Sequence, residues 1–372
     1  MRRRFALAVV ALIAGASMAS AELYRWPLPA WMPPPPVPAD NPMSAAKVAL
    51  GRHLFYDGRL SRDGTVACAS CHLQARAFTD GRDVAVGIGG EAGTKNAPGL
   101  ANTGYFPVLT WANPHMTSLE FQALVPIFGE TPEEMGAAGQ EAVILARLAA
   151  DPYYAQAFAA AFPDRPTPDL FTVTRALGAF QRSLISVNSA YDRFKYRRDP
   201  AALSDAAKRG EQLFFGEKME CYHCHGGMHF TDNLQTARMP QPEIGFHNTG
   251  LYADYAIVPG LIETTGQPQD AGRFRTPSLR NVAVTAPYMH DGSIPDLRGV
   301  VAHYANGGRA PGHPQKDGLI VGFKVTEAET ADLIAFLESL TDTEFLSDPA
   351  HSDPWPAEHP AVVNRMMPAP PG

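Results

Sequence analysis

The segment Cys68-Ala-Ser-Cys71-His72 has a counterpart 153 positions later, Cys221-Tyr-His-Cys224-His225. Both have the form C-x-x-C-H, and together they contain all 4 cysteines of the 372-residue chain. Two thiols at this spacing can bond to the two vinyl groups of one haem, and the adjacent His is then held beneath the iron as its proximal ligand. We therefore expect two covalently attached c-type haems.

Other uses of these cysteines fit the pattern less well. A redox-active C-x-x-C pair has no need of a His at the next position in both copies. A zinc site made of two such pairs usually has roughly 15–20 residues between them, whereas 149 residues separate Cys71 from Cys221. Disulfides are compatible with an exported chain, but they do not account for the repeated His.

The sequences on either side of the two motifs also repeat. Gly51-Arg-His-Leu-Phe-Tyr56 precedes the first motif, and Gly210-Glu-Gln-Leu-Phe-Phe215 precedes the second. Phe78-Thr-Asp80 follows the first motif, and Phe230-Thr-Asp232 follows the second. The chain therefore contains a duplicated haem-binding unit.

Helix signals recur along the chain. Asn41-Pro42 and Ser204 are expected to open the helix before each motif. Thr167-Pro-Asp-Leu170 introduces an apolar stripe of helical period that ends before Asn188, and Thr326-Glu-Ala-Glu329 is a capping box before the closing helix. No stretch shows sustained period-two alternation, so the predicted fold class is mainly α.

Composition predicts short helices joined by long ordered loops. The chain has 34 Pro and 32 Gly among 372 residues, which is about 18% against an average of about 12%. A length of this order favours two domains, which we expect to be cytochrome c-like haem domains. The expected layout is a signal peptide (1–21), a Pro-rich arm (22–40), an N-terminal haem domain (41–198), a C-terminal haem domain (199–346) and a tail (347–372).

The N-terminus has the pattern of a secretory signal. Arg2-Arg3-Arg4 precedes the apolar run Phe5 to Ala14, and Ala19-Ser-Ala21 supplies a small-residue cleavage site. A membrane anchor is the alternative, but the apolar run is shorter than the roughly 20 residues that span a bilayer. We expect export to a bacterial periplasm, a mature chain that begins near Glu22, and no membrane-spanning segment.

Charge argues against a nucleic-acid partner. The full chain has a formal net charge of −7, and loss of the three Arg of the signal leaves 28 basic residues against 38 acidic ones. An acidic protein repels the phosphate backbone, so nucleic-acid binding is not expected.

The second haem lacks an obvious Met ligand. Met is a common sixth ligand of c-type haems, but after Met289 the next Met is Met366 in the Pro-rich tail. The segment downstream of the second motif offers His303 and Tyr304 instead. On these grounds either residue is a candidate ligand.

With these motifs the chain resembles the bacterial di-haem cytochrome c peroxidases and their MauG-like relatives, from Asn41 to about Leu346. The most specific stretch is Arg275-Thr-Pro-Ser-Leu-Arg-Asn-Val-Ala-Val-Thr-Ala-Pro-Tyr-Met-His-Asp-Gly292. Gly245-Phe-His-Asn-Thr-Gly-Leu251 and Leu124-Val-Pro-Ile-Phe-Gly129 look most like the MbnH branch. The resemblance implies an H2O2-dependent enzyme that oxidises a partner protein.

The resemblance also implies a ligand for the second haem. The peroxidases place a Met 19 positions after a Thr-x-Pro calcium motif, which here is Thr285-Ala-Pro287. The matching position is Tyr304, and MauG-like proteins have Tyr there. Ligation by His225 and Tyr304 is therefore implied, with His303 as the rival. An anionic phenolate stabilises oxidised iron better than a thioether does.

For the first haem the resemblance implies an open iron. Ordinary peroxidases often carry a distal His in the loop after the first motif, and here Ile88 stands at that position. A catalytic Glu follows a Gln-x-x-x-Pro element in the family, and Gln122-Ala-Leu-Val-Pro126 matches that element. Glu134 matches the acid, but its interval from Pro126 is two residues longer than in the family. Glu133 and Glu130 therefore stay as alternatives.

Electron exchange between the haems of this family passes a Trp that lies 15 positions after the Asn of an Asn-Ala-Pro motif. Asn96-Ala-Pro98 and Trp111 keep that interval. The resemblance also implies a calcium ion held by Asn96 and by the backbone carbonyls of Thr285 and Pro287, since oxygen donors suit a hard cation.

The implied mechanism begins when peroxide reacts at the His72 haem with help from Glu134. Two oxidising equivalents then spread over both haems through Trp111 and oxidise Trp side chains of a partner protein, which the resemblance to the MbnH branch implies to be periplasmic and copper-binding. The alternatives are a conventional peroxidase that takes electrons from a small cytochrome or cupredoxin, and a di-haem electron carrier without peroxide chemistry.

Overall fold

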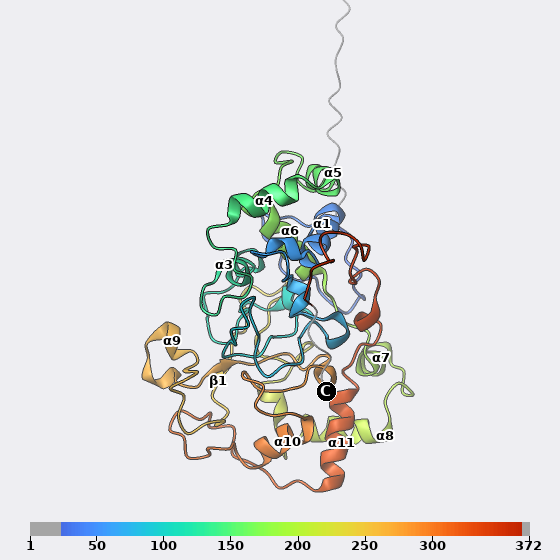
Figure 1. Ribbon diagram of the computed structural model, residues 1–372. Coiled ribbons are helices and arrows are strands. Elements are labelled where there is room, and N and C mark those ends of the chain that lie inside the picture. Colours follow the sequence, from blue (N-terminus) through green and yellow to red (C-terminus); the bar gives the residue numbers. More distant parts are fainter. Residues whose placement is uncertain (1–23, 367–372) are drawn as a thin grey trace, which may run out of the picture.

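The computed structural model describes residues 24–366. The predicted signal peptide (1–21) and the last residues of the tail lie outside this range. The described chain is mainly α, as predicted, with short helices and long ordered connections (Figure 1). The helices are α1 (Ala45–Phe55), α2 (Leu119–Gln122), α3 (Leu124–Phe128), α4 (Glu141–Ala149), α5 (Pro152–Ala161), α6 (Leu170–Ser183), α7 (Ala190–Arg197), α8 (Asp205–Phe214), α9 (Ile262–Thr265), α10 (Leu297–Ala305) and α11 (Glu327–Glu338).

Sheet structure is minimal. Within residues 24–366 the one sheet consists of β1 (Phe246–His247) and β2 (Phe274–Arg275), which pair antiparallel with Phe246 opposite Arg275. The longest helix, α6, has 14 residues. The excess of Pro and Gly therefore corresponds to loops, as the composition predicts.

Three of the four predicted helix starts are confirmed. Ser204 caps α8, Asp169 caps α6, and Thr326 forms a capping box with Glu329 at the start of α11. The prediction for α1 was wrong, because Ser44 and not Asn41 accepts from the first-turn backbone. The Asn41 amide is buried and donates 2.7 Å to Glu120 of α2, so a long-range hydrogen bond takes the place of the cap.

The duplicated glycines allow two close helix pairs. α1 packs against α6 in the upper half of Figure 1, and α8 packs against α11 in the lower half. A Cβ added to Gly51 would lie 1.9 Å from the carbonyl oxygen of Ala176, and one added to Gly210 would lie 2.0 Å from that of Asp332. Because glycine lacks this atom, each pair of backbones can approach closely. The repeat in the sequence is thus a repeat in packing.

Each helix pair contributes to its own buried apolar cluster. The first cluster includes Leu50, Leu54 and Phe180 and joins the segments around the first motif. The second includes Phe214 and Phe336 and joins the segments around the second motif. Burial of such side chains is the main favourable term in folding, so each motif is attached to a separate part of the core.

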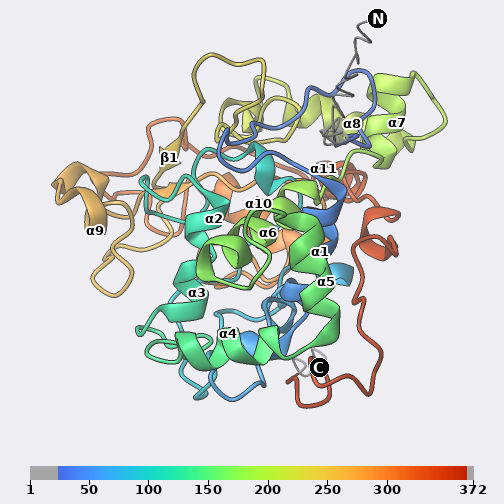
Figure 2. The ribbon, with the colours of Figure 1, turned by 90° about the horizontal axis from the view of Figure 1, so that it is seen from above.

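The C-terminal tail packs on the first unit. The hydroxyl of Tyr56, which follows α1, donates 2.7 Å to the carbonyl oxygen of His351, and the Arg52 Nε donates 2.7 Å to that of Ser352. Trp355 packs against Tyr153 and Tyr154 of α5. Figure 2 shows the tail in red beside these helices. The tail therefore covers one face of the first unit.

Among residues 24–366, no helix combines the length and the apolar character that crossing a bilayer requires.

Candidate haem sites

The two C-x-x-C-H motifs adopt the same local structure. Each starts with a 3₁₀ turn, and the backbone N–H of each His donates to the carbonyl oxygen of the first Cys, at 3.0 Å for His72 and 2.9 Å for His225. Phe78 and Phe230, which close the two loops, both have a left-handed backbone, with φ of 66° and 53°. The motifs are thus equivalent in conformation as well as in sequence.

Both motif histidines present a free Nε2 atom. The Nδ1 of His72 lies 2.6 Å from the carbonyl oxygen of Phe78, and that of His225 lies 3.1 Å from that of Phe230. A carbonyl oxygen only accepts, so Nδ1 carries the proton and the lone pair is on Nε2. Burial lowers the pKa of both imidazoles, which favours the neutral form. This is the state and orientation of an axial iron ligand.

Three of the four motif thiols favour the protonated form. Burial raises the pKa of Cys68, Cys71 and Cys221 to about 12. Attachment to haem ends in a neutral thioether, so the half-buried Cys pairs, each next to a His, are compatible with covalent haem.

A cavity of about 300 Å³ lies at the second motif. This volume falls within the range of cofactor sites, roughly 300–1,000 Å³. Apolar side chains from β2, α10 and α11 line it together with the motif itself. The sequence-predicted residues on its wall are Cys221, Cys224, His225, Tyr304, Trp111, Asn96, Thr285 and Pro287. The cavity fits a haem attached to the second motif.

Tyr304 and His303 differ in their relation to this cavity. Tyr304 of α10 lines it together with His225, and burial raises the pKa of its phenol. His303 is not among the lining residues, is 3% exposed, and has a pKa that burial lowers to about 4. Of the two residues, Tyr304 therefore faces the cavity that His225 also lines.

Glu134 lies near the first motif. Its charge contributes to the raised pKa of both Cys68 and Cys71, and burial raises the pKa of its own carboxyl. The backbone N–H of Ile88 donates 2.9 Å to the Glu134 carbonyl oxygen, so the residue at the distal-His position and the predicted acid are neighbours.

The other two candidate acids point elsewhere. Glu133 forms a 2.7 Å ion pair with Arg62 at the surface, and Glu130 is exposed. Gln122 is the last residue of α2 and Pro126 lies in α3, and both are half-buried. The backbone N–H of Met135 donates 3.0 Å to the Pro126 carbonyl, which joins the Gln-x-x-x-Pro element to the Glu134 loop.

Trp111 is held at the wall of the second cavity by backbone hydrogen bonds. Its indole Nε1 donates 2.8 Å to the carbonyl oxygen of Asn96, and its own carbonyl accepts 2.8 Å from the Arg275 backbone N–H of β2. The Arg275 guanidinium carbon lies 5.7 Å from the centre of the indole ring. These contacts hold the ring at the cavity wall.

The predicted calcium ligands also meet at this wall. Asn96 donates through Nδ2 to the Arg82 carbonyl at 2.7 Å, and its backbone N–H donates 2.8 Å to the His290 carbonyl. Thr285 and Pro287 line the same cavity as Asn96. Asn96 thus lies at the wall of the same cavity as Thr285 and Pro287, which follow it by 189 and 191 positions in the chain.

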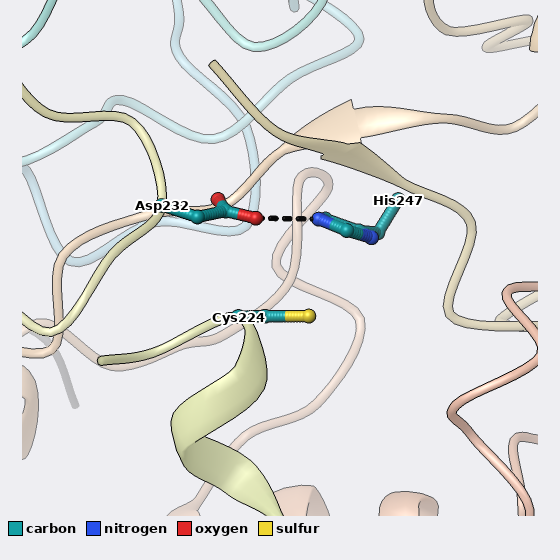
Figure 3. A group of neighbouring side chains, drawn as sticks. All are labelled: Cys224, Asp232 and His247. Carbon is teal, nitrogen blue, oxygen red and sulfur yellow. Dashed lines mark hydrogen bonds and ion pairs between the residues drawn. The ribbon is translucent and has the colours of Figure 1, made fainter. Parts of the chain in front are cut away.

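One group at the second motif was missed by the sequence analysis. His247 of β1 lies between two carboxylates, with Nε2 2.6 Å from Asp232 Oδ2 and Nδ1 2.6 Å from Asp317 Oδ2. Ligand-type atoms of Cys224, Asp232 and His247 all lie within 4.8 Å of one another (Figure 3). The Gly245 to Leu251 segment contains this His, but nothing in the sequence pairs it with two distant acids.

The electrostatics of His247 are dominated by its carboxylates. Burial alone lowers the pKa of this imidazole, but the hydrogen bonds that the ring donates to Asp232 and Asp317 favour its charged form, and together with Cys224 they raise the pKa. Two carboxylate partners, one at each ring nitrogen, therefore favour the imidazolium.

Comparisons with known proteins identify the family of the chain. A family model described as di-haem cytochrome c peroxidase matches residues 45–200. The cytochrome-c peroxidase IdrP1 of Denitromonas iodatirespirans is 39% identical over 94% of this chain and 95% of its own, and the methylamine utilization protein MauG of Methylorubrum extorquens is 37% identical over 82% and 81%.

Among solved structures, a MauG-like protein associated with microbial copper homeostasis is 48% identical and superposes with a TM-score of 0.86, over 90% of this chain and 100% of that one. The relatives are cytochrome c peroxidases and MauG proteins, which are H2O2-dependent oxidoreductases with two c-type haems. The chain belongs to the di-haem cytochrome c peroxidase and MauG family.

Proposed function

We propose that this enzyme reacts with H2O2 at an open first haem, holds two oxidising equivalents over both haems and withdraws electrons from Trp residues of a partner protein. The observation that carries this proposal is the phenol of Tyr304, which shares the cavity of the second motif with His225. A phenolate favours oxidised iron more than the Met thioether of ordinary c-type cytochromes does.

The haems, when bound, supply the iron that takes up peroxide and the redox capacity that stores the oxidising equivalents. His72 and His225 would hold the two irons through Nε2, with Cys68, Cys71, Cys221 and Cys224 as thioether attachments. Tyr304 would be the second ligand at the His225 haem. The first haem would keep one side open, because Ile88 stands where a distal His could bind.

Glu134 would move a proton between the two peroxide oxygens. Burial raises the pKa of its carboxyl, which makes a transferred proton easier to hold before it is returned. The ion pair with Arg62 keeps Glu133 at the surface, so Glu134 is the better candidate. Gln122 and Pro126 would position the Glu134 loop through α2 and α3.

Trp111 would form the bridge for electrons between the haems. Its hydrogen bond to Asn96 holds the ring at the wall of the second cavity. We further propose one calcium ion at the Asn96 side chain and the Thr285 and Pro287 carbonyls. Such an ion would tie the Asn96 loop, and with it Trp111, to the second unit.

We also propose the predicted layout of two haem domains, 41–198 and 199–346, with arms 22–40 and 347–372. The basic and apolar pattern of residues 1–21 supports export to the periplasm. The proposed partner is a periplasmic protein, and a copper-binding one is favoured because the 48% identical MauG-like protein is associated with copper homeostasis.

The test starts with the ferric protein. Electron paramagnetic resonance should show one high-spin and one low-spin haem, whereas two low-spin haems would favour a simple electron carrier. H2O2 is then added without a donor, and a reductant titration should recover two oxidising equivalents per protein after minutes. Rapid loss of these equivalents, together with fast turnover on a reduced small cytochrome, would favour a conventional peroxidase.

A further inference from the structure

Asp232, His247 and Asp317 form a unit that we name the His247 clamp. Both ring nitrogens of His247 lie 2.6 Å from carboxylate oxygens. An ionised carboxylate only accepts hydrogen bonds, so both nitrogens must donate and the ring carries a positive charge. The clamp therefore holds two negative charges and one positive charge, a net charge of −1.

The clamp lies at the edge of the second haem site. The Cys224 Sγ is within 4.8 Å of the ligand-type atoms of Asp232 and His247, and His247 lines the cavity that contains His225 and Tyr304 (Figure 3). A metal ion in place of the haem does not fit here. Both imidazole nitrogens carry protons, so His247 offers no free lone pair to a metal ion, and Cys224 is assigned to haem attachment by its place in the C-x-x-C-H motif.

Three separate segments build the clamp. β1 carries His247, the loop after the second motif carries Asp232, and the backbone N–H of Asp317 donates 2.8 Å to the Asn248 carbonyl. Gly245 makes room for the acid, because a Cβ there would lie 2.0 Å from Asp232 Oδ2. A larger residue at position 245 would therefore displace the Asp232 carboxylate from its place against β1.

The first unit has the acid without the imidazolium. Asp80 of Phe78-Thr-Asp80 corresponds to Asp232, and its charge acts on the Cys71 thiol. The Asp80 Oδ1 accepts from the Arg82 backbone N–H at 3.0 Å, while Oδ2 is buried without a hydrogen-bond partner among residues 24–366. Arg76 and Arg82 act on Asp80 in the first unit, whereas an imidazolium contacts Asp232 in the second, so the two sites differ in the cation beside the acid.

We propose that the His247 clamp sets the reduction potential of the second haem, with His247 as a permanent positive charge that offsets the two carboxylates. Positive charge near a haem stabilises its reduced form and negative charge stabilises its oxidised form. Arg275 and Arg273 also act on Asp232 and Asp317, so loss of the His247 charge would leave the two carboxylates less compensated and favour the oxidised haem more strongly. This inference rests on the proposed haem at Cys221, Cys224 and His225, and it assigns His247 a positioning and electrostatic role.

The experiment is a spectroelectrochemical titration of the low-spin haem in the purified holoenzyme at pH 7. His247→Gln removes the positive charge and should lower the midpoint potential. Asp317→Asn removes a negative charge, leaves His247 paired with Asp232, and should raise it. Glu327→Gln makes the same charge change at an exposed position, where solvent screens it, and should leave the potential unchanged.

Opposite shifts from His247→Gln and Asp317→Asn would establish the electrostatic role, since a merely structural defect moves both variants in the same direction. Equal potentials in all variants, or shifts of one sign, would overturn it. If His247→Gln does not fold, the direction of the Asp317→Asn shift decides alone. The number of haems per chain, measured by mass and by pyridine haemochrome spectra, distinguishes failure of this inference from failure of the proposed function. Absence of the second haem would refute the proposed haem site itself.

Discussion

The indole Nε1 of Trp111 donates a hydrogen bond of 2.8 Å to the backbone carbonyl oxygen of Asn96. This bond joins the proposed electron bridge to the residue proposed as a calcium ligand. Both residues line the cavity of the second motif. A change at the calcium site is therefore expected to reach the orientation of the Trp111 ring.

Trp111→Phe should slow electron exchange between the haems by at least about tenfold, which corresponds to ~1.4 kcal/mol in activation free energy. The Phe ring keeps the volume but is harder to oxidise and has no N–H for Asn96. Stopped-flow absorbance of the low-spin haem after mixing with H2O2 measures the rate. Trp355→Phe in the tail is the matched control, and equal rates in the two variants would remove Trp111 from the path.

Glu134→Gln should slow the reaction with H2O2 by about 10²–10⁴-fold, the usual contribution of a positioned acid-base group. Glu133→Gln is the control and should react at nearly the wild-type rate, because its partner is the surface residue Arg62. A slow Glu133→Gln variant and a fast Glu134→Gln variant would exchange the two roles.

The pH profile of the same reaction provides a second check on Glu134. Burial raises the pKa of this carboxyl above its usual 4.5. The carboxylate form accepts the first proton, so the wild-type rate should fall as the pH drops through this raised pKa. Glu134→Gln should lack that fall, and a profile shared by both proteins would assign the titration to another group.

Tyr304→Phe should convert the low-spin ferric haem to a high-spin one, because it removes the proposed ligand oxygen and leaves the ring in place. His303→Gln is the matched control on α10 and should keep the low-spin signal, since His303 does not line the cavity. Electron paramagnetic resonance measures both. A low-spin Tyr304→Phe variant combined with a high-spin His303→Gln variant would make His303 the ligand.

Calcium removal should destabilise the protein. At a free concentration of about 100 times Kd, a ligand that binds only the folded state contributes about 2.7 kcal/mol. Elemental analysis should find one calcium per chain, and chelation should lower Tm. Asn96→Ala should lose both the ion and the effect of the chelator. A metal-free wild-type protein with an unaltered Tm would refute the site.

Gly51→Ala and Gly210→Ala should each cost about 1–3 kcal/mol of unfolding free energy, as overpacking usually does. The added Cβ would lie 1.9 Å and 2.0 Å from a carbonyl oxygen of the facing helix. Gly89→Ala is the control, because no heavy atom lies within 4 Å of its added Cβ. Denaturant titration compares the three, and equal stabilities would show that the helix pairs can separate without cost.

Much of the fold and of the cofactor chemistry could be predicted from short-range patterns. The C-x-x-C-H spacing determines which atoms can attach one haem, and the caps at Ser204 and Thr326 act within a single helical turn. In each of these signals the interacting residues are close together in the sequence, so the pattern can be recognised without the tertiary structure. The prediction at Asn41 was wrong because its side chain bonds to Glu120, 79 positions away.

The sequence by itself therefore predicted the two haem attachments, and it determined the duplicated motifs and the mainly α class. Only the tertiary structure decided which of His303 and Tyr304 faces the second cavity, that Glu134 lies near the first motif, and that Asp232 and Asp317 enclose His247. These relations join segments far apart in the chain. Helix packing and burial bring such segments together, and the spacing of residues within a short segment does not predict these contacts.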